Sequence, residues 1–232
     1  MALTDSLEVY WKMDEASGTR EDSTAANNDL TDNNTVGSAT GIISLGADFV
    51  AANSEYLSTA TELDAVFTSN AWSVSLWAKP DDVTSTYALI SRDVALNRQF
   101  LFAINSAGLY FERAGLPITN TSTGITTDFQ HIVLTYNGTN LVAYINTVQN
   151  DSDAMTALPS VDASIDLNIG RREFVGSNYY ANAIIDEVGI WSKVLSSDEI
   201  TELYNGGAGF TYPFVAASAT LARRRMMTGI GA

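Results

Sequence analysis

One change of hydrophobic period near the carboxyl end constrains the fold of this chain more than any other feature. Residues 183–191 fit a β-strand of period two, in which Asp186 and Val188 share one face. The residues that follow fit a short helix, because they supply a capping serine, a capping-box acid, an apolar stripe and a terminating glycine. In chain order these are Ser196 or Ser197, then Glu199, then Ile200, Leu203 and Tyr204, and finally Gly206. A strand that leads into a short helix is what we expect where a domain closes.

Strand-like stretches also recur at short intervals along the rest of the chain. Turn signals such as residues 105–108 and 137–140 separate them, and residues 16–42 are polar enough to predict a surface loop. This spacing predicts antiparallel hairpins in a two-sheet sandwich. The stretches are residues 7–13, 72–78, 87–92, 99–105, 108–113, 130–136, 141–146, 165–169 and 183–191.

The carboxyl-terminal run resembles the signature of the laminin-G-like, concanavalin A-like jelly rolls, in which G-x-I-D-E-V-R-I-Y leads into L-S-x-x-E-I-x-x-L-Y. The resemblance covers about residues 7–205. It implies an all-β, two-sheet antiparallel jelly-roll sandwich over residues 1–205, with a short C-terminal helix and an extended tail over 206–232. Asn146-Thr147 stands where the family usually has Asn-Gly at a hairpin. Further matching pieces follow the family's order at residues 10–19, 56–57, 72–80, 129–136, 143–146 and 169–170.

Composition and charge exclude several classes of function. Without cysteine the chain can form neither a disulfide nor a thiolate metal site. The net charge of -15 repels phosphate backbones, so nucleic acid is not an expected partner. The charge is also uneven, because all 27 acidic residues precede Gly206 whereas three arginines follow it.

The chain contains neither a membrane span nor a signal peptide that we can identify. No stretch reaches the roughly 20 apolar residues that a membrane helix needs, and residues 1–5 lack the basic and apolar regions of a secretory signal. Proteins that resemble this family are usually extracellular. A bacteriophage virion protein is assembled inside a cell and released with the particle, so it becomes extracellular without a signal peptide. We therefore expect display on a virion surface or another extracellular assembly.

The tail carries apolar and basic residues that a solvated end would not need. We therefore predict that the tail docks either on a neighbouring copy of this chain, as in a homo-oligomer, or on another partner. The alternative is a disordered end. The predicted contact residues are Phe210, Tyr212, Phe214, Arg223, Arg224 and Arg225.

No catalytic constellation is evident. Retaining glucanases of this architecture carry Glu-x-Asp-x-x-Glu on one strand, but this chain has Ile184, Asp186 and Gly189 at those places. The single histidine, His131, lies within a predicted strand, which favours an interior role. We therefore predict a non-catalytic module and retain a carbohydrate-active enzyme, or a binding domain cut from one, as the alternative.

Calcium is the one cofactor that the sequence suggests, because loop carboxylates and carbonyls are the ligands that this cation takes. Resemblance to the family favours Asp22 together with Asp186. The alternative is that Asp186 pairs with backbone amides, or with Lys12 or Arg20.

Sugar recognition usually needs an aromatic stacking surface beside planar polar groups. One loop supplies such a cluster, and the connection before residue 99 supplies another. We predict a module that binds a glycan or a protein, with a purely structural assembly role as a further alternative. The predicted sugar-binding residues are Arg172, Asn178, Tyr179 and Tyr180 in the first cluster, and Asn97 and Arg98 in the second.

Overall fold

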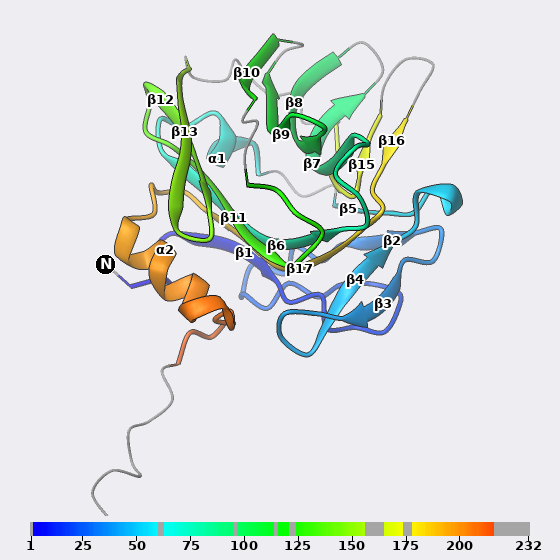
Figure 1. Cartoon of the computed structure of the whole chain (residues 1–232). Coiled ribbons are helices and arrows are strands. Elements are labelled where there is room, and N and C mark those ends of the chain that lie inside the picture. The colour runs from blue at the N-terminus through cyan, green and yellow to red at the C-terminus, as the bar shows by residue number, and fades with distance from the viewer. Residues whose placement is uncertain are drawn as a thin grey trace, which may run out of the picture.

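Two antiparallel β-sheets lie face to face in the computed structural model, as the jelly-roll prediction requires (Figure 1). The structure describes residues 2–59, 63–94, 97–113, 116–120, 124–155, 165–173 and 178–215. Strands that are distant in the sequence are neighbours in each sheet, which is typical of a jelly roll. The all-β, two-sheet prediction is therefore confirmed.

The first sheet has the order β13-β12-β11-β6-β17-β4-β3, and β1 also pairs with β17. Its strands are β1 (Leu7–Trp11), β3 (Gly37–Thr40), β4 (Leu45–Phe49), β6 (Trp72–Pro80), β11 (Gln130–Tyr136), β12 (Asn140–Ile145), β13 (Val148–Ala154) and β17 (Ala183–Trp191).

The second sheet has the order β10-β9-β8-β7-β14-β5-β2, and a separate pair of strands, β15-β16, lies beside it. Its strands are β2 (Thr31–Asn33), β5 (Tyr56–Thr59), β7 (Tyr87–Val94), β8 (Asn97–Asn105), β9 (Gly108–Arg113), β10 (Leu116–Asn120) and β14 (Leu167–Ile169), and the separate pair is β15 (Arg171–Arg172) and β16 (Tyr179–Tyr180).

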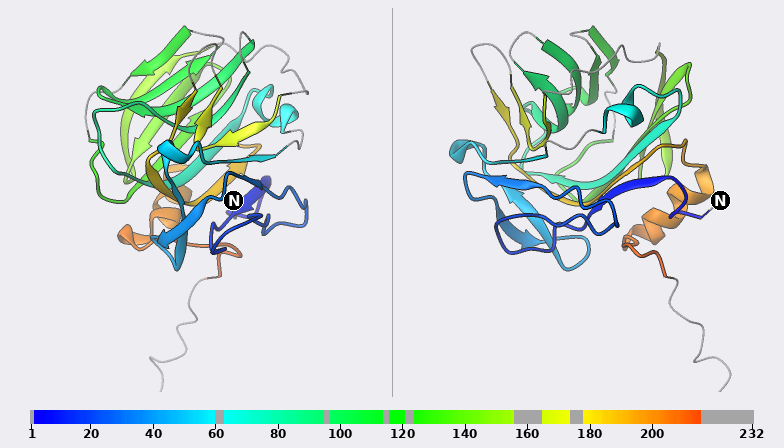
Figure 2. Two further views of the ribbon diagram at one scale, coloured as in Figure 1. Left: turned by 90° about the vertical axis from the view of Figure 1, so that its right-hand side faces the viewer. Right: turned by 180° about the vertical axis from the view of Figure 1, so that it is seen from behind.

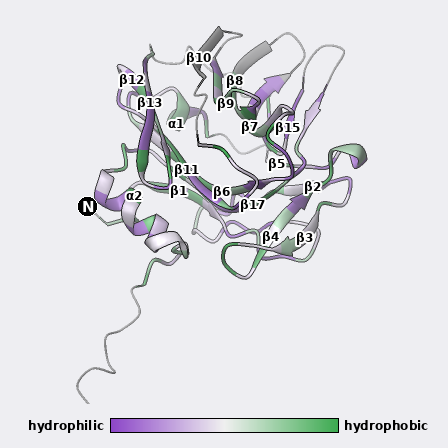
Figure 3. Cartoon of the chain, in the orientation of Figure 1, coloured by the Kyte–Doolittle hydropathy of each residue, from purple (hydrophilic) through white to green (hydrophobic). Residues whose placement is uncertain are grey.

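Aromatic side chains from both sheets meet in the core. Trp72 of the first sheet lies 6.3 Å from Phe111 of the second, measured between ring centroids. Phe67, from the short helix α1 (Asp64–Phe67), lies 4.6 Å from Phe100. Hydrophobic and hydrophilic residues are mixed along the strands, as expected of sheets with an inner and an outer face (Figure 3).

The helix α2 (Ser197–Tyr204) covers the side of the first sheet that faces away from the second (Figure 2). Its buried Ile200 and Leu203 join a second apolar cluster with Tyr10 and Trp191. The predicted capping box is present. The helix ends at Tyr204, because Asn205 takes the left-handed conformation that was expected of Gly206.

Residues 16–42 are not simply a surface loop, since they include β2 and β3. Arg20 is completely buried. Its guanidinium donates hydrogen bonds to the carbonyls of Val36 and Gly37 at 3.0 and 2.9 Å. The sequence could not predict this arrangement, because a buried arginine that hydrogen-bonds to loop carbonyls cannot be told from an exposed one by composition.

The β12–β13 hairpin turns through two residues with positive φ, Asn146 at 48° and Thr147 at 73°. Two-residue hairpins with this pattern favour Asn-Gly, since a β-branched residue is strained in the left-handed region. Thr147 therefore carries backbone strain that glycine would relieve.

A pair of buried acids lies in β17. Asp186 and Glu187 are 0% and 3% exposed. Glu187 has a φ of 49° at an irregularity in the pairing with β6. Tyr10 donates its hydroxyl to Glu187 Oε2 at 2.5 Å. Burial, with repulsion from Glu187, raises the pKa of Asp186 to about 8, and burial raises the pKa of Glu187 to about 7.

We expect Thr147→Gly to raise the free energy of unfolding by about 0.5–1 kcal/mol, because it removes the left-handed strain of a β-branched residue. Urea unfolding followed by tryptophan fluorescence measures this change. Thr201→Gly, on an exposed turn of α2, serves as the control and should be destabilising by a similar amount. A lower stability of Thr147→Gly would contradict the strain argument.

We expect stability to fall as the pH rises from about 4 to about 8. The ordinary pKa values of the two carboxyls are 3.8 and 4.5, so between these and the raised values the folded chain holds protons that the unfolded chain releases. Each carboxyl then lowers the free energy of unfolding by up to about 1.4 kcal/mol per pH unit.

Urea unfolding at a series of pH values measures this dependence. Asp186→Asn should give a shallower slope than the wild type, whereas Asp153→Asn on β13 should keep the wild-type slope. Equal slopes for the wild type and Asp186→Asn would show that Asp186 does not titrate in this range.

Candidate functional site

A polar cleft opens where the β15–β16 pair meets strands β5, β14 and β7 of the second sheet. Its volume is about 170 Å³. The β15 and β16 strands rise beside β7 in Figure 1, and they place two arginines and two tyrosines next to each other. The residues that line the cleft are Tyr56, Asp93, Ile165, Asp166, Asn168, Arg171 and Glu173.

Two adjacent arginines on β15 have different surroundings, because successive side chains of a strand point to opposite faces. Arg171 lines the cleft. Its guanidinium lies 4.4 Å from the centroid of the Tyr56 ring, within the range of a cation–π interaction. Arg171 also forms an ion pair with Glu173. A flat aromatic face and a planar cation therefore border the same small space.

Arg172 instead supports the cleft from within. It is 6% exposed, and its Nε pairs with Asp93 Oδ2 at 2.8 Å while Nη2 pairs with Glu112 Oε1 at 2.6 Å. Tyr110 donates its hydroxyl to Glu112 Oε2 at 2.7 Å. Burial alone would lower the pKa of Arg172, but the hydrogen bond to Glu112 and the charge of Asp93 raise it overall. The guanidinium therefore stays charged, and it holds β7 and β9 to β15.

The predicted aromatic cluster lies beside this cleft and contacts it through Tyr180, although none of its residues lines the cleft. Tyr180 on β16 has its ring centroid 6.3 Å from that of Tyr56. Asn178 donates its side-chain amide to the Tyr180 hydroxyl at 3.1 Å. Tyr179 is 37% exposed, which leaves its ring available to a ligand. Tyr180 is thus close to Asn178 and to Tyr56, whereas Tyr179 is paired with Arg172 and lies on the opposite face of β16.

The second predicted cluster lies on the strand next to the cleft. In the β7–β8 pairing Asn97 is opposite Val94, and Arg98 is opposite the cleft residue Asp93. The backbone register thus brings both predicted clusters to one region. The side chains of Asn97 and Arg98 lie outside the described part of the structure.

The sequence prediction included none of the seven residues that line the cleft, among them Tyr56, Asn168 and Arg171. Of the adjacent arginines it named Arg172, which the structure buries in ion pairs, whereas Arg171 reaches the cleft. The alternation of side chains along a strand shows that the two arginines point to opposite faces. It shows which of them reaches the cleft only if the orientation of β15 is already known.

The two predicted calcium ligands serve other purposes in the structure. Asp22 closes its own loop, since its oxygens accept hydrogen bonds from the amides of Tyr10, Thr24 and Asn28 at 2.9 to 3.1 Å. Asp186 Oδ2 accepts from the amide of Ile42 at 2.8 Å, which matches the backbone-amide alternative.

These hydrogen bonds use carboxylate lone pairs that would otherwise be available to a cation. The donors to Asp22 differ from the donor to Asp186, so the two aspartates do not meet at one place. Within the described residues, no group of three or more histidine or acidic side chains could hold a metal ion. Calcium binding through Asp22 and Asp186 therefore stays a prediction, without a site in the described part of the chain.

His131 is interior, as its place in a strand suggested. It is 1% exposed and packs beside the stacked rings of Trp77 and Tyr204, at centroid distances of 5.2 and 6.2 Å. Its Nε2 lies 2.8 Å from Ser75 Oγ, and burial lowers the pKa of His131 to about 3.

Ser75 is only 2% exposed, and among the described residues nothing hydrogen-bonds to His131 Nδ1. A catalytic serine–histidine pair needs a substrate-accessible serine and a group that orients the other ring nitrogen. This buried pair offers neither, so it does not form a triad.

The three aromatic residues predicted to bind a partner pack against their own domain. Tyr212 and Phe214 have ring centroids 6.0 and 5.2 Å from that of Tyr10, and Phe210 joins the same apolar cluster. Residues 209–215 and α2 also border a cavity of about 550 Å³. The predicted contacts of Arg223, Arg224 and Arg225 lie outside the described residues.

Several solved structures share this fold at low sequence identity. One is domain 4 of AbnA, a GH43 extracellular arabinanase from Geobacillus stearothermophilus, in complex with arabinotriose. It has a TM-score of 0.65 and 20% identity, and the match covers 85% of this chain and 97% of that one.

Toxin binding domains also share the fold. The binding domain of botulinum neurotoxin DC in complex with SialylT has a TM-score of 0.67 and 16% identity, with coverage of 88% and 52%. The binding domain of Paraclostridial Mosquitocidal Protein 1 has a TM-score of 0.67 and 15% identity, with coverage of 89% and 53%. This chain thus spans about half the length of the toxin structures.

No curated protein sequence matches the chain. A laminin G family model matches residues 51–201, which is more than half of the chain. That range includes β6, β11 and β17 at the centre of the first sheet, and most of the second sheet. On this match, the chain belongs to the concanavalin A-like lectin/glucanases superfamily.

Proposed function

We propose that this chain is a non-catalytic glycan-binding module and that the polar cleft at Tyr56 and Arg171 is its binding site. The observation that carries the proposal is the combination of aromatic faces, planar hydrogen-bonding groups and a small cavity in one place. The 170 Å³ volume suits a single sugar ring better than a folded peptide segment.

The chemistry of the lining matches a sugar. The apolar C–H face of a sugar ring packs on an aromatic ring; Tyr56 lines the cleft, and the ring of Tyr180 lies next to it. Sugar hydroxyls both donate and accept hydrogen bonds, and Asn168, Asp166 and Arg171 supply both kinds of partner.

Two similar structures support this class of ligand. The arabinanase domain was solved with arabinotriose, and the neurotoxin binding domain with SialylT. Because their sequence identities to this chain are 20% and 16%, they support a binding role for the fold rather than a particular ligand.

The ion pairs in and behind the cleft favour binding over hydrolysis. Glu112 and Asp93 hold Arg172, and Glu173 holds Arg171. A glycosidase needs one carboxylic acid and one carboxylate that are free to exchange protons with the substrate. The cleft carboxylates that are committed to arginines are poorly suited to that exchange.

Display on an extracellular assembly is part of this proposal, and a phage particle is the specific version that we predict. Extracellular display is supported by the extracellular arabinanase that contains the similar domain 4, whereas the phage particle stays a prediction. Among the described residues, none of the helices is long and apolar enough to cross a membrane. Assembly through the C-terminal residues also stays a prediction.

We expect Tyr56→Ala and Arg171→Ala each to lower the affinity for a bound oligosaccharide about tenfold, since each removes half of the stacked pair at the cleft. A glycan array with the full chain identifies the ligand, and isothermal titration calorimetry measures the affinity. Tyr144→Ala on β12 of the first sheet is the matched control and should bind as the wild type does.

Unchanged affinity in both cleft variants would place the binding site elsewhere, and no bound glycan at all would contradict the proposed function. Incubation of the ligand with the chain, followed by an assay for new reducing ends, distinguishes the enzyme alternative. We expect no new reducing ends.

A further inference from the structure

The charges around the cleft carry an inference about which sugars it accepts. Among the described side chains at the site, the cations are the two arginines of β15, and both are already engaged in ion pairs. Arg171 forms its ion pair with Glu173 inside the cleft, and Arg172 forms two ion pairs behind it. An anionic ligand would have to displace a carboxylate from one of these arginines before it could pair with the cation.

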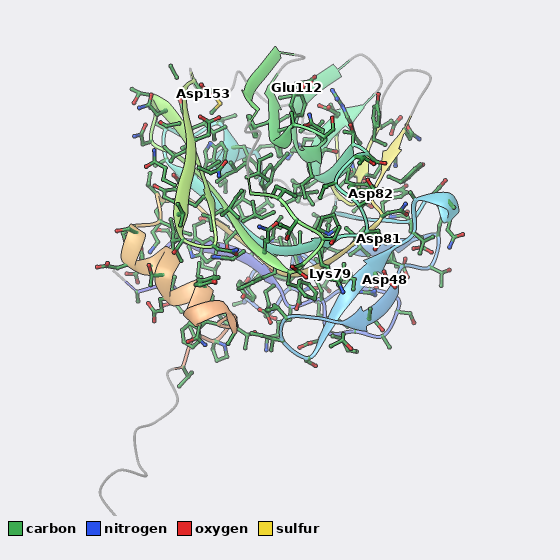
Figure 4. All side chains as sticks on the ribbon, in the orientation of Figure 1. Asp48, Lys79, Asp81, Asp82, Glu112 and Asp153 are labelled. Atoms are coloured by element: carbon green, nitrogen blue, oxygen red, sulfur yellow. The ribbon has the colours of Figure 1, made fainter. Side chains whose placement is uncertain are left out.

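The carboxylates outnumber the cations at this place. Asp93, Asp166 and Glu173 line the cleft itself, and Glu112 lies directly behind it on β9, where Figure 4 labels it. Against these four acids stand the two arginines of β15. The described residues of the cleft and its support thus have a net charge of -2 at neutral pH.

Two of these acids lie at the surface of the cleft. Asp166 is exposed, and Glu173 has a side chain that is 35% exposed. A carboxylate or sulfate on a sugar would approach these two groups at close range, whereas the hydroxyls of a neutral sugar could donate hydrogen bonds to them. The overall charge of -15 adds repulsion in the same direction.

We propose that the cleft selects neutral sugars and rejects sugars that carry a carboxylate or a sulfate. This inference rests on the proposed glycan-binding function and adds the ligand class to it. The selectivity arises from ion pairs that keep both arginines occupied and from the acids at the cleft opening.

The test uses the full chain and pairs of oligosaccharides that differ only or mainly in an acidic group. Suitable pairs are lactose with 3′-sialyllactose, galactotriose with trigalacturonate, and maltotriose with its form oxidised at C6. Calorimetry at low ionic strength should show the acidic member of each bound pair at least about tenfold weaker. The difference should shrink at about 1 M salt, where the Debye length is about 3 Å.

Two variants connect the selectivity to the cleft. Asp166→Asn and Glu173→Gln should each lower the ratio of neutral to acidic affinity by about threefold or more, because each removes a like charge from the opening. Asp153→Asn changes the net charge equally but lies on β13 of the first sheet (Figure 4). This control should keep the wild-type ratio.

The outcomes separate this inference from the function on which it rests. If an acidic sugar binds as tightly as its neutral partner and Tyr56→Ala weakens both, the glycan site stands and the charge selectivity is wrong. If Asp153→Asn changes the ratio as much as Asp166→Asn does, the cleft charges are not the cause. If neither member of any pair binds and the array is also empty, the proposed function itself fails.

Discussion

Burial of the first sheet on both faces is the constraint on which the rest of the structure depends. One face packs against the second sheet, and α2 with residues 209–215 covers the other. Each ionisable residue on these central strands must therefore find a partner inside the protein. The Glu187 carboxylate accepts a hydrogen bond from the Tyr10 hydroxyl, and His131 shares a hydrogen bond with the Ser75 hydroxyl. These ionisable groups thereby serve stability, and the proposed sugar cleft lies instead at the second sheet and its neighbouring strand pair.

The sequence predicts the scaffold well because its signals are local. The period-two strands, the Ser196 capping box and the strand-to-helix change each depend on a few adjacent residues, and the structure contains all of them. The loop at residues 16–42 was harder to predict, since burial of Arg20 depends on carbonyls 16 and 17 residues away in the chain. Composition carries no trace of such contacts.

The candidate site was only partly predictable for a similar reason. The tyrosines and Asn178 could be identified because loop aromatics beside polar groups are typical of sugar sites. Tyr56 belongs to a strand that precedes Arg171 by more than 110 residues, and only the tertiary fold brings its ring next to that guanidinium. The choice between Arg171 and Arg172 depends on which face of a two-residue strand meets the sheet, and no local pattern decides that.

The packing of residues 209–215 also fixes where Val215, the last described residue, lies on the domain. Phe214 rests on Tyr10 beside α2, whereas the polar cleft lies by β15 and β16 on another side of the sandwich (Figures 1 and 2). Cargo fused after Val215 would consequently emerge away from the sugar cleft. The domain could be tethered by that end to a bead, a surface or a larger assembly with its cleft still facing outward.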